Sequence, residues 1–175
     1  MKIKQPLLHT PYWIVVGIVL VANSCSTQKA SQKPQEHMEL GWVDRSVVQS
    51  SQYPWFDTVY AAYQPITDML EDVQTKLDSA QFLIVFGTWC PDSKREVPRF
   101  FKIADLLNIR KDHIQLFAVD RSKQHPEGIP QQYSITNVPT FIVLEHGQEV
   151  GRIVEKPKTK LEFDLLEIFA PLMQK

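Results

Sequence analysis

One stretch of the sequence constrains the fold more than any other: residues 82–93 read Phe-Leu-Ile-Val-Phe-Gly-Thr-Trp-Cys-Pro-Asp-Ser. Its uninterrupted apolar run predicts a strand that is buried on both faces of a sheet. The run ends at Trp89 and Cys90, and Pro91 then stiffens the entry to a helix. The chain therefore carries a cysteine where a buried strand passes into a helix. A second cysteine that would close a Cys-x-x-Cys pair is missing, because that position is Ser93.

The start of a helix is a favourable place for thiol chemistry. The thiolate, not the thiol, attacks disulfides, and the first N–H groups of a helix and its dipole both favour an anion. Lys94 and Arg95 add positive charge in the first turn, whereas Asp92 opposes it. Asp92 is either an acid–base group beside Cys90 or an exposed carboxylate favoured by the dipole. We expect Trp89 to shield one side of the sulfur.

The composition suits one globular domain and excludes several classes of function. The 175 residues are 43% apolar and 22% charged, which is enough for a real core. A formal net charge of −1 provides no field for nucleic acid. The five histidines are scattered without metal-ligand spacing, so no metal site is expected.

The N-terminus has the pattern of a secretory signal. Two lysines precede an apolar stretch over 12–22 that is too short to span a bilayer. It ends in Val-Ala-Asn-Ser-Cys, which resembles the lipobox of bacterial lipoproteins, where a small residue precedes a lipidated cysteine. We therefore predict that residues 1–24 are a signal peptide and that Cys25 carries lipid. A cleaved signal followed by an ordinary cysteine is one alternative, and a retained signal-anchor is the other.

A lipid on Cys25 would leave Cys90 as the free thiol of the chain. Residues 25–57 then comprise the lipidated N-terminus, a flexible tether and an irregular lead-in segment that contains several aromatic side chains. We expect those aromatics to pack on the domain; a partner-binding patch is the alternative. The resemblance to lipoproteins implies attachment to the membrane of a bacterial cell envelope, with the domain facing the periplasm. By the same resemblance, Ser26 after Cys25 and the lack of an acidic run behind it favour the outer membrane over the inner one.

Hydrophobic periodicity predicts an alternation of helices and strands after this segment. Helices are expected over 59–77, 93–107 and 158–173, and strands over 81–87, 113–120, 140–144 and 149–154. Pro65 must start or kink the first of these helices. Residues 121–137 predict a loop with one helical turn around 131–134. The part of it over 121–132 either shapes substrate entry or is an ordinary surface loop. Residues 145–148 predict a hairpin turn. This order predicts an α/β fold, a central mixed β-sheet flanked by helices on both faces.

Three landmarks in this order resemble the thioredoxin superfamily. Trp89-Cys90-Pro91-Asp92-Ser93 stands where the family has Trp-Cys-x-x-Cys, Pro98 falls where its active-site helix kinks, and Asn137-Val138-Pro139-Thr140-Phe141 resembles its Val-Pro-Thr loop. The resemblance implies a thioredoxin-like domain over 58–175. It also implies that Pro139 is cis, and that Val138, Pro139 and Thr140 bind an extended substrate beside Cys90.

Two departures limit what the resemblance carries over. Ser93 cannot attack a mixed disulfide, and Ile84 stands where many thioredoxins have a buried aspartate that helps to deprotonate the resolving cysteine. The chain therefore lacks both the resolving thiol and the carboxylate that would deprotonate it, which the second half-reaction of a dithiol reductase uses. A disulfide formed by Cys90 must be resolved by an external thiol, such as glutathione, a substrate thiol or a partner protein. No bound cofactor is expected.

Three functions remain open. In the first, Cys90 of a monothiol oxidoreductase or isomerase-like protein forms mixed disulfides with envelope proteins. In the second, the chain is a binding module that holds extended peptides or a partner between Trp89 and Pro139, and Cys90 is idle. In the third, peroxide oxidises Cys90 to a sulfenic acid, as in a peroxidase or a sensor. A reactive thiol favours the first and third functions, and peroxide consumption separates those two.

Overall fold

A five-stranded mixed sheet forms the middle of the structure, a computed structural model that describes residues 37–174. The strands are β1 (Gly41–Val43), β2 (Gln81–Phe86), β3 (Ile114–Ala118), β4 (Thr140–Glu145) and β5 (Gln148–Val154). Their order in the sheet is β1-β3-β2-β4-β5. β2 and β3 are parallel, and every other neighbouring pair is antiparallel. The predicted mixed sheet is confirmed.

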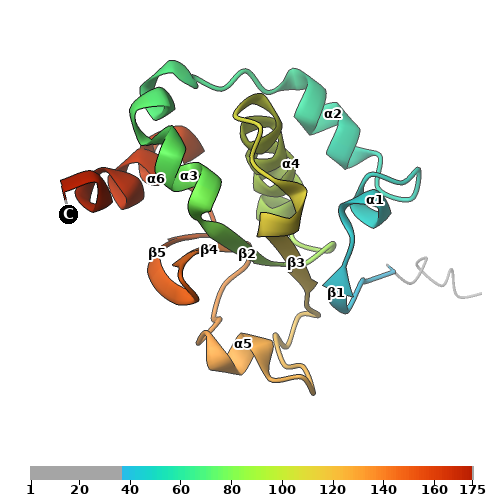
Figure 1. The fold of residues 1–175 in the computed structure, drawn as a ribbon. Helices are drawn as coiled ribbons and strands as arrows, with labels where there is room; N and C mark the ends of the chain where they lie inside the picture. The colour runs from blue at the N-terminus through green and yellow to red at the C-terminus, as the bar shows by residue number, and fades with distance from the viewer. Residues whose placement is uncertain (1–36, 175) are drawn as a thin grey trace, which may run out of the picture. The chain divides into compact units, whose positions relative to one another are not determined.

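Helices lie on both faces of the sheet, but unequally (Figure 1). One face carries α1 (Arg45–Val48), α2 (Trp55–Ala62), α3 (Gln74–Ser79), α4 (Pro91–Leu106) and α6 (Leu161–Phe169). The opposite face carries only the short α5 (Ile129–Gln132) with its flanking loops among the described residues. Three 3-10 helices, η1 (Asp68–Val73), η2 (Lys111–His113) and η3 (Ala170–Gln174), complete the elements of residues 37–174.

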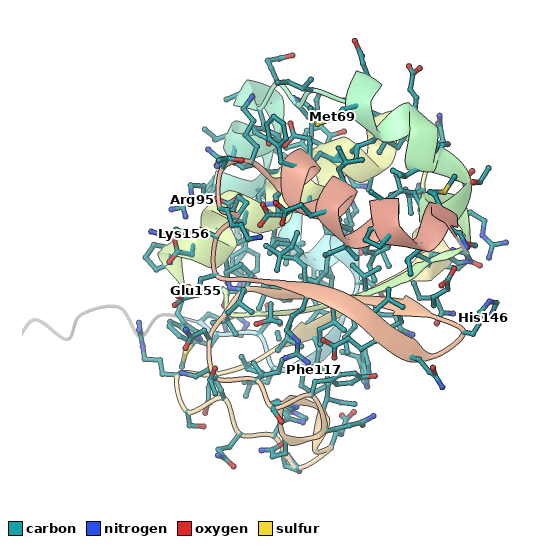
Figure 2. All side chains as sticks on the ribbon, turned by 90° about the vertical axis from the view of Figure 1, so that its left-hand side faces the viewer. Met69, Arg95, Phe117, His146, Glu155 and Lys156 are labelled. Carbon is teal, nitrogen blue, oxygen red and sulfur yellow. The ribbon has the colours of Figure 1, made fainter. Side chains whose placement is uncertain are left out.

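The buried strand β2 divides the core into two clusters. Its side chains alternate between the faces, so Phe82, Ile84 and Phe86 pack under the helices. Leu83 and Val85 point the other way, into a smaller cluster that includes Cys90. Figure 2 shows Met69 on the helix-covered side of the sheet and Phe117 on the side of α5. The predicted continuous apolar strand is therefore buried from both sides.

The helix expected over 59–77, with a start or kink at Pro65, is instead fully interrupted around Pro65. α2 ends at Ala62, Tyr63 is extended with φ −77° and ψ 130°, and the chain becomes helical again only at η1 and α3. Pro65 lacks an N–H and disfavours the helical conformation of the residue before it. The N–H of Ile66 instead donates to the side chain of Glu162 at 2.8 Å.

The other predicted elements match the observed ones closely. The C-terminal helix is shorter than predicted, because α6 ends at Phe169 and η3 continues the chain. In the predicted hairpin, His146 and Gly147 have φ of 53° and 77°. Left-handed conformations at both central residues give the tight turn that suits twisted antiparallel strands.

The predicted lead-in segment contributes directly to the sheet. Gly41–Val43 forms β1, which pairs with β3 at the edge. Tyr53 and Phe56 are buried, and Trp55 packs against the larger cluster. Trp42 is 48% exposed, but its ring lies edge-on against Phe117 with centroids 5.0 Å apart, so the aromatics of this segment pack on the domain. The predicted signal peptide, Cys25 and most of the tether lie outside the described residues. Between residues 37 and 174, no helix has both the length and the apolar character needed to cross a membrane.

Candidate functional site

Cys90 stands at the junction that the sequence predicted, between β2 and α4. It is the N-cap residue of α4, with extended backbone angles, and its carbonyl accepts the N–H of Lys94 at 3.0 Å. Its own N–H donates to the carbonyl of Gly87 at 2.9 Å, which closes the turn between strand and helix. The residue is only 6% exposed. The sulfur therefore sits at the positive end of a sixteen-residue helix, near the rim of the smaller cluster.

Ser93 occupies the position of the missing second sulfur and is fully buried. Its Oγ accepts a hydrogen bond from the N–H of Gly87 at 3.2 Å. The hydroxyl thus satisfies a buried backbone donor of the turn that carries Cys90. Ser93 holds the loop, but an alcohol cannot replace a thiol in disulfide exchange.

The loop before β4 meets Cys90 across the site. The peptide bond between Val138 and Pro139 is cis, which confirms that prediction. The Cys90 thiol donates to the carbonyl of Val138 with an Sγ–O distance of 3.1 Å. Thr140 Oγ1 donates to the carbonyl of Asn137 at 2.7 Å and braces the loop from within. A carbonyl oxygen has two lone pairs, so the Cys90 thiol occupies one of the two acceptor positions at Val138.

Trp89 is fixed by backbone contacts that the sequence did not reveal. Its indole Nε1 donates to the carbonyl of Val119 at 2.8 Å. A Cβ at Gly87 would stand 2.6 Å from Nε1, so only glycine leaves room for the ring. The guanidinium carbon of Arg121 lies 4.7 Å from the centroid of the ring. In the sequence, the close approach of the Trp89 ring to the backbone is indicated locally only by the glycine, Gly87, that directly follows the strand.

The order of these parts, a cysteine at a helix start facing a cis-proline loop, agrees with the comparison with protein families. The family model described as Thioredoxin matches residues 67–166. The chain belongs to the thioredoxin family. The match includes Cys90, Ser93 and Pro139, so the thioredoxin motif and its departure lie within the matched region.

Thioredoxins from distant organisms are similar to this chain. Thioredoxin Y1, chloroplastic, of Arabidopsis thaliana is 31% identical over 85 residues, 49% of this chain and 46% of that protein. The chain thus spans about half the length of that relative. Thioredoxin H-type of Fagopyrum esculentum is 26% identical over 113 residues, 63% of this chain and 91% of that protein.

Solved thioredoxins also align with the structure. The Fasciola hepatica thioredoxin aligns with a TM-score of 0.38 and 22% identity, over 58% of this chain and 89% of that chain. Thioredoxin 2 from Pseudomonas aeruginosa PAO1 aligns with a TM-score of 0.37 and 18% identity, over 63% and 94%.

Asp92 of the thioredoxin motif and the charged residues that follow it form an ion-pair chain along α4. Arg95 donates to Glu96 at 2.6 Å and to Asp92 at 2.5 Å. The hydrogen bond to Glu96, and then that to Asp92, outweigh burial and raise the pKa of Arg95. Arg99 also pairs with Glu96, at 3.1 Å. The positive charge of Arg95 is therefore shared between two carboxylates, and Asp92 is engaged in an ion pair.

The segment before β1 supports the turn that carries the thioredoxin cysteine. The N–H of Glu39 donates to Oγ1 of Thr88 at 3.3 Å. Tyr53 donates from its hydroxyl to Oε1 of Glu39 at 2.7 Å, and burial and this bond raise the pKa of Tyr53. These contacts span up to 49 positions in sequence, so no local pattern could have predicted them.

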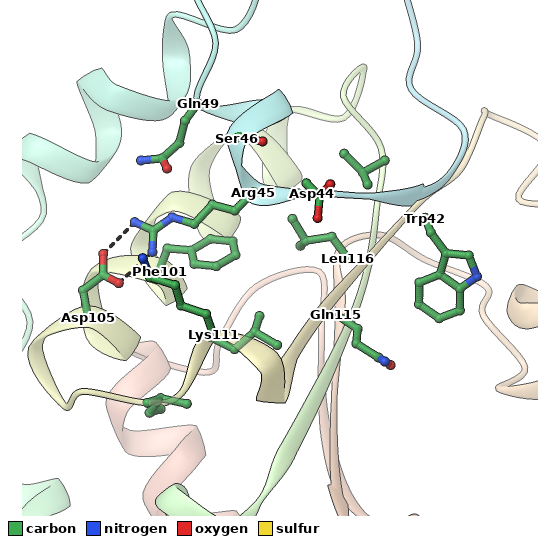
Figure 3. A pocket seen from close by; sticks show the side chains of 13 residues that line it. Trp42, Asp44, Arg45, Ser46, Gln49, Phe101, Asp105, Lys111, Gln115 and Leu116 are labelled. Atoms are coloured by element: carbon green, nitrogen blue, oxygen red, sulfur yellow. Dashed lines mark hydrogen bonds and ion pairs between the residues drawn. The ribbon is translucent and has the colours of Figure 1, made fainter.

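A cavity of about 700 Å³ lies away from the thioredoxin motif, between β1, α1, α4 and the start of β3 (Figure 3). Arg45 donates two hydrogen bonds of 2.6 Å to Asp105 across its wall, and Tyr60 adds one of 2.7 Å. Burial opposes ionisation, but these bonds outweigh it and lower the pKa of Asp105. The carboxylate is satisfied by its neighbours, so we assign the Arg45–Asp105 pair a structural role. Within residues 37–174, no group of three or more His, Cys, Asp or Glu side chains is placed to hold a metal ion.

Proposed function

We propose that the chain is a monothiol thiol–disulfide exchange protein in which Cys90 forms mixed disulfides that an external thiol resolves. The observation that carries this proposal is that Cys90 occupies a thioredoxin-like site in which the second cysteine position is Ser93. Cys90 has the helix N-terminus and the Val138–Pro139 loop of a thioredoxin site. Ser93 is buried beneath it and holds Gly87, so the second sulfur has been replaced by a structural hydroxyl.

The chemistry needs two exchange steps. In the first, the Cys90 thiolate attacks one sulfur of a partner disulfide; the partner's S–S bond breaks, a mixed disulfide forms and the other partner sulfur leaves as a thiolate. In the second, an external thiolate such as that of glutathione attacks the mixed disulfide at the partner sulfur and releases the Cys90 thiolate. The number of disulfides is unchanged, so the cycle moves disulfide bonds between partners.

We further propose that the exchange takes place at a bacterial cell envelope. Lipid on Cys25 would tether the domain at the periplasmic face, where the partners would be envelope proteins with cysteines or extended peptides. The lipobox-like sequence supports this proposal. Replacement of Cys25 by alanine should abolish the incorporation of labelled fatty acid into the protein; incorporation that persists in the variant would contradict lipid on Cys25.

One observation favours a second candidate, the binding module. Cys90 is nearly buried, and its thiol is engaged by the Val138 carbonyl. A module of this kind would bind extended peptides through the Val138–Pro139 loop without forming a covalent bond. The Cys90→Ser variant would then bind peptides as well as the wild type does.

An exchange assay separates the two candidates. The full chain carrying Cys25→Ser is mixed with a peptide disulfide and reduced glutathione, and peptide–glutathione disulfide is followed by mass spectrometry. We expect faster exchange than in buffer, and loss of that acceleration in the matched variant that also carries Cys90→Ser. Equal rates with and without Cys90 would contradict the exchange function and leave the binding module.

A further inference from the structure

The turn that ends in Cys90 is held by contacts from two distant segments. The N–H of Cys90 closes this turn on the carbonyl of Gly87 at 2.9 Å, so Thr88 and Trp89 are its two central residues. The Trp89 side chain is held just after β3, where its Nε1 donates to the carbonyl of Val119 at 2.8 Å. The Thr88 side chain is buried, with 2% of the residue exposed. The backbone that carries the sulfur is therefore fixed through two neighbouring side chains.

Thr88 belongs to a closed ring of hydrogen bonds with Glu39 and Tyr53. Its Oγ1 accepts the N–H of Glu39 at 3.3 Å, and its hydroxyl also bonds to the phenol oxygen of Tyr53. The Tyr53 hydroxyl donates to Oε1 of Glu39 at 2.7 Å, which closes the ring. Each of the three residues thus contacts the other two, although Glu39 and Thr88 are 49 positions apart in the sequence.

Tyr53 joins the members of this ring because a phenol can donate one hydrogen bond and also accept. Burial and then the bond to Glu39 raise the pKa of Tyr53, so the phenol keeps its proton at neutral pH and remains the donor. Two exposed residues add contacts from the surface: Gln52 Nε2 donates to the phenol oxygen at 3.3 Å, and His37 Nε2 lies 3.2 Å from Glu39 Oε1. Removal of the phenol hydroxyl would take one partner from the buried Thr88 hydroxyl and the phenol donor from Glu39.

We propose that Tyr53 is a positioning residue for Cys90, and that it acts through Thr88 on the turn that ends in the cysteine. The inference rests on the exchange function proposed for Cys90 and adds no covalent step to it. A partner disulfide reacts only when its sulfur meets the Cys90 sulfur in the right orientation. A turn that is free to move presents the sulfur correctly for a smaller fraction of the time, so exchange slows although the thiol is intact.

Removal of the phenol hydroxyl tests this role. The full chain carrying Cys25→Ser is mixed with a peptide disulfide, and the rate of mixed-disulfide formation at Cys90 is measured by mass spectrometry with and without Tyr53→Phe. We expect the rate to fall about fivefold, the size of one lost hydrogen bond that is fully formed in the transition state. Thr88→Val, which removes the other hydroxyl at similar shape, should give a similar fall. Thr88→Ser, which keeps the hydroxyl, should react at nearly the wild-type rate.

Tyr63→Phe is a matched control, because it removes the same kind of bond from the helix-covered side. Tyr63 follows α2 and donates to Oε2 of Glu162 in the first turn of α6 at 2.6 Å. This variant should lose stability to denaturant, but should keep the wild-type rate at Cys90. The double variant Tyr53→Phe, Thr88→Val should react no more slowly than either single variant, because the two hydroxyls act as one unit. An equal fall in Tyr63→Phe, or additive falls in the double variant, would overturn the positioning role.

The failures of the two proposals are distinguishable. If the wild type forms the mixed disulfide and Tyr53→Phe forms it at the same or a higher rate, the role of Tyr53 is overturned and the exchange function stands. If the wild type forms no mixed disulfide, the exchange function and with it the positioning role are overturned. Near-ultraviolet circular dichroism shows whether each variant is folded. Should Tyr53→Phe not fold, the Thr88 pair decides: a fall confined to Thr88→Val supports the role, and equal rates in Thr88→Val and Thr88→Ser overturn it.

Discussion

The two faces of the sheet are held together by different kinds of contact. On the helix-covered face, Phe100 packs against Phe82 and Phe141 with ring centroids 5.2 and 5.4 Å apart. On the opposite face, the Cys90 thiol and the Trp89 indole each donate a hydrogen bond to a backbone carbonyl. The first face is filled by interlocking side chains, whose contacts are lost only by opening the core. The second is covered by α5 and its loops. The larger cluster on the helix-covered face therefore stabilises this thioredoxin fold, whereas the candidate reactive residue, Cys90, lies in the smaller cluster on the opposite face.

The largest effect is expected where the packing is densest. Leu165 of α6 is fully buried in the larger cluster. Leu165→Ala should lower the free energy of unfolding by about 3–4 kcal/mol, because removal of a buried leucine side chain leaves a cavity. Denaturant unfolding measures this loss. Under native conditions the alkylation rate of Cys90 should stay the same; a large change in that rate would show that the two faces are not independent.

A matched substitution on the opposite face should lower the free energy of unfolding less, and should change the alkylation rate of Cys90 more. Ile135 is 8% exposed and belongs to the smaller cluster with Cys90. Ile135→Ala should lower the free energy of unfolding by about 2 kcal/mol, since a site at the surface can relax around the missing atoms. The same variant should raise the alkylation rate of Cys90. A loss of stability as large as that of Leu165→Ala, with no change in the rate, would reverse the comparison.

A smaller loss of stability is expected from a polar contact between the end of α2 and the first turn of α6. Tyr63 donates to Oε2 of the fully buried Glu162 at 2.6 Å. Tyr63→Phe removes one donor from this carboxylate and should cost about 1–2 kcal/mol, read from the denaturant midpoint at neutral pH. Retention of full stability would show that the contact contributes nothing net.

The same contact gives the stability an alkaline pH dependence. Burial and the bond to Glu162 raise the pKa of Tyr63. The unfolded chain releases the phenol proton from about pH 10, whereas the folded chain retains it. The free energy of unfolding should therefore fall as the pH rises past about 10, and the fall should be smaller in Tyr63→Phe. Equal slopes in wild type and variant between about pH 9 and about pH 11 would contradict this role of Tyr63.

The sequence predicted those parts of the molecule that depend on neighbours along the chain. The buried run of β2, Cys90 at the start of α4, and the loop with Pro139 all follow from local pattern and from the family resemblance. Pro65 indicated a start or kink in this helix, but the full break after Ala62 was not predicted, because the Ile66 N–H finds its acceptor on Glu162, 96 positions away.

The surroundings of Trp89 were missed for the same reason. Val119 and Arg121 reach the indole only after β3 has paired beside β2. Arg121 begins a polar loop in the sequence, and nothing in that pattern distinguishes it from any other surface cation. Such contacts are set by the sheet and not by the local sequence.

The central claim is that Cys90 forms a mixed disulfide which Ser93 cannot resolve. The most direct test incubates the full chain carrying Cys25→Ser with oxidised glutathione and measures the intact mass, beside the matched variant that also carries Ser93→Cys. The account predicts one glutathione on the Ser93 protein, stable until an external thiol is added, and an internal disulfide without glutathione in the Ser93→Cys variant. Absence of any adduct on the Ser93 protein, or a persistent adduct on both proteins, would contradict it.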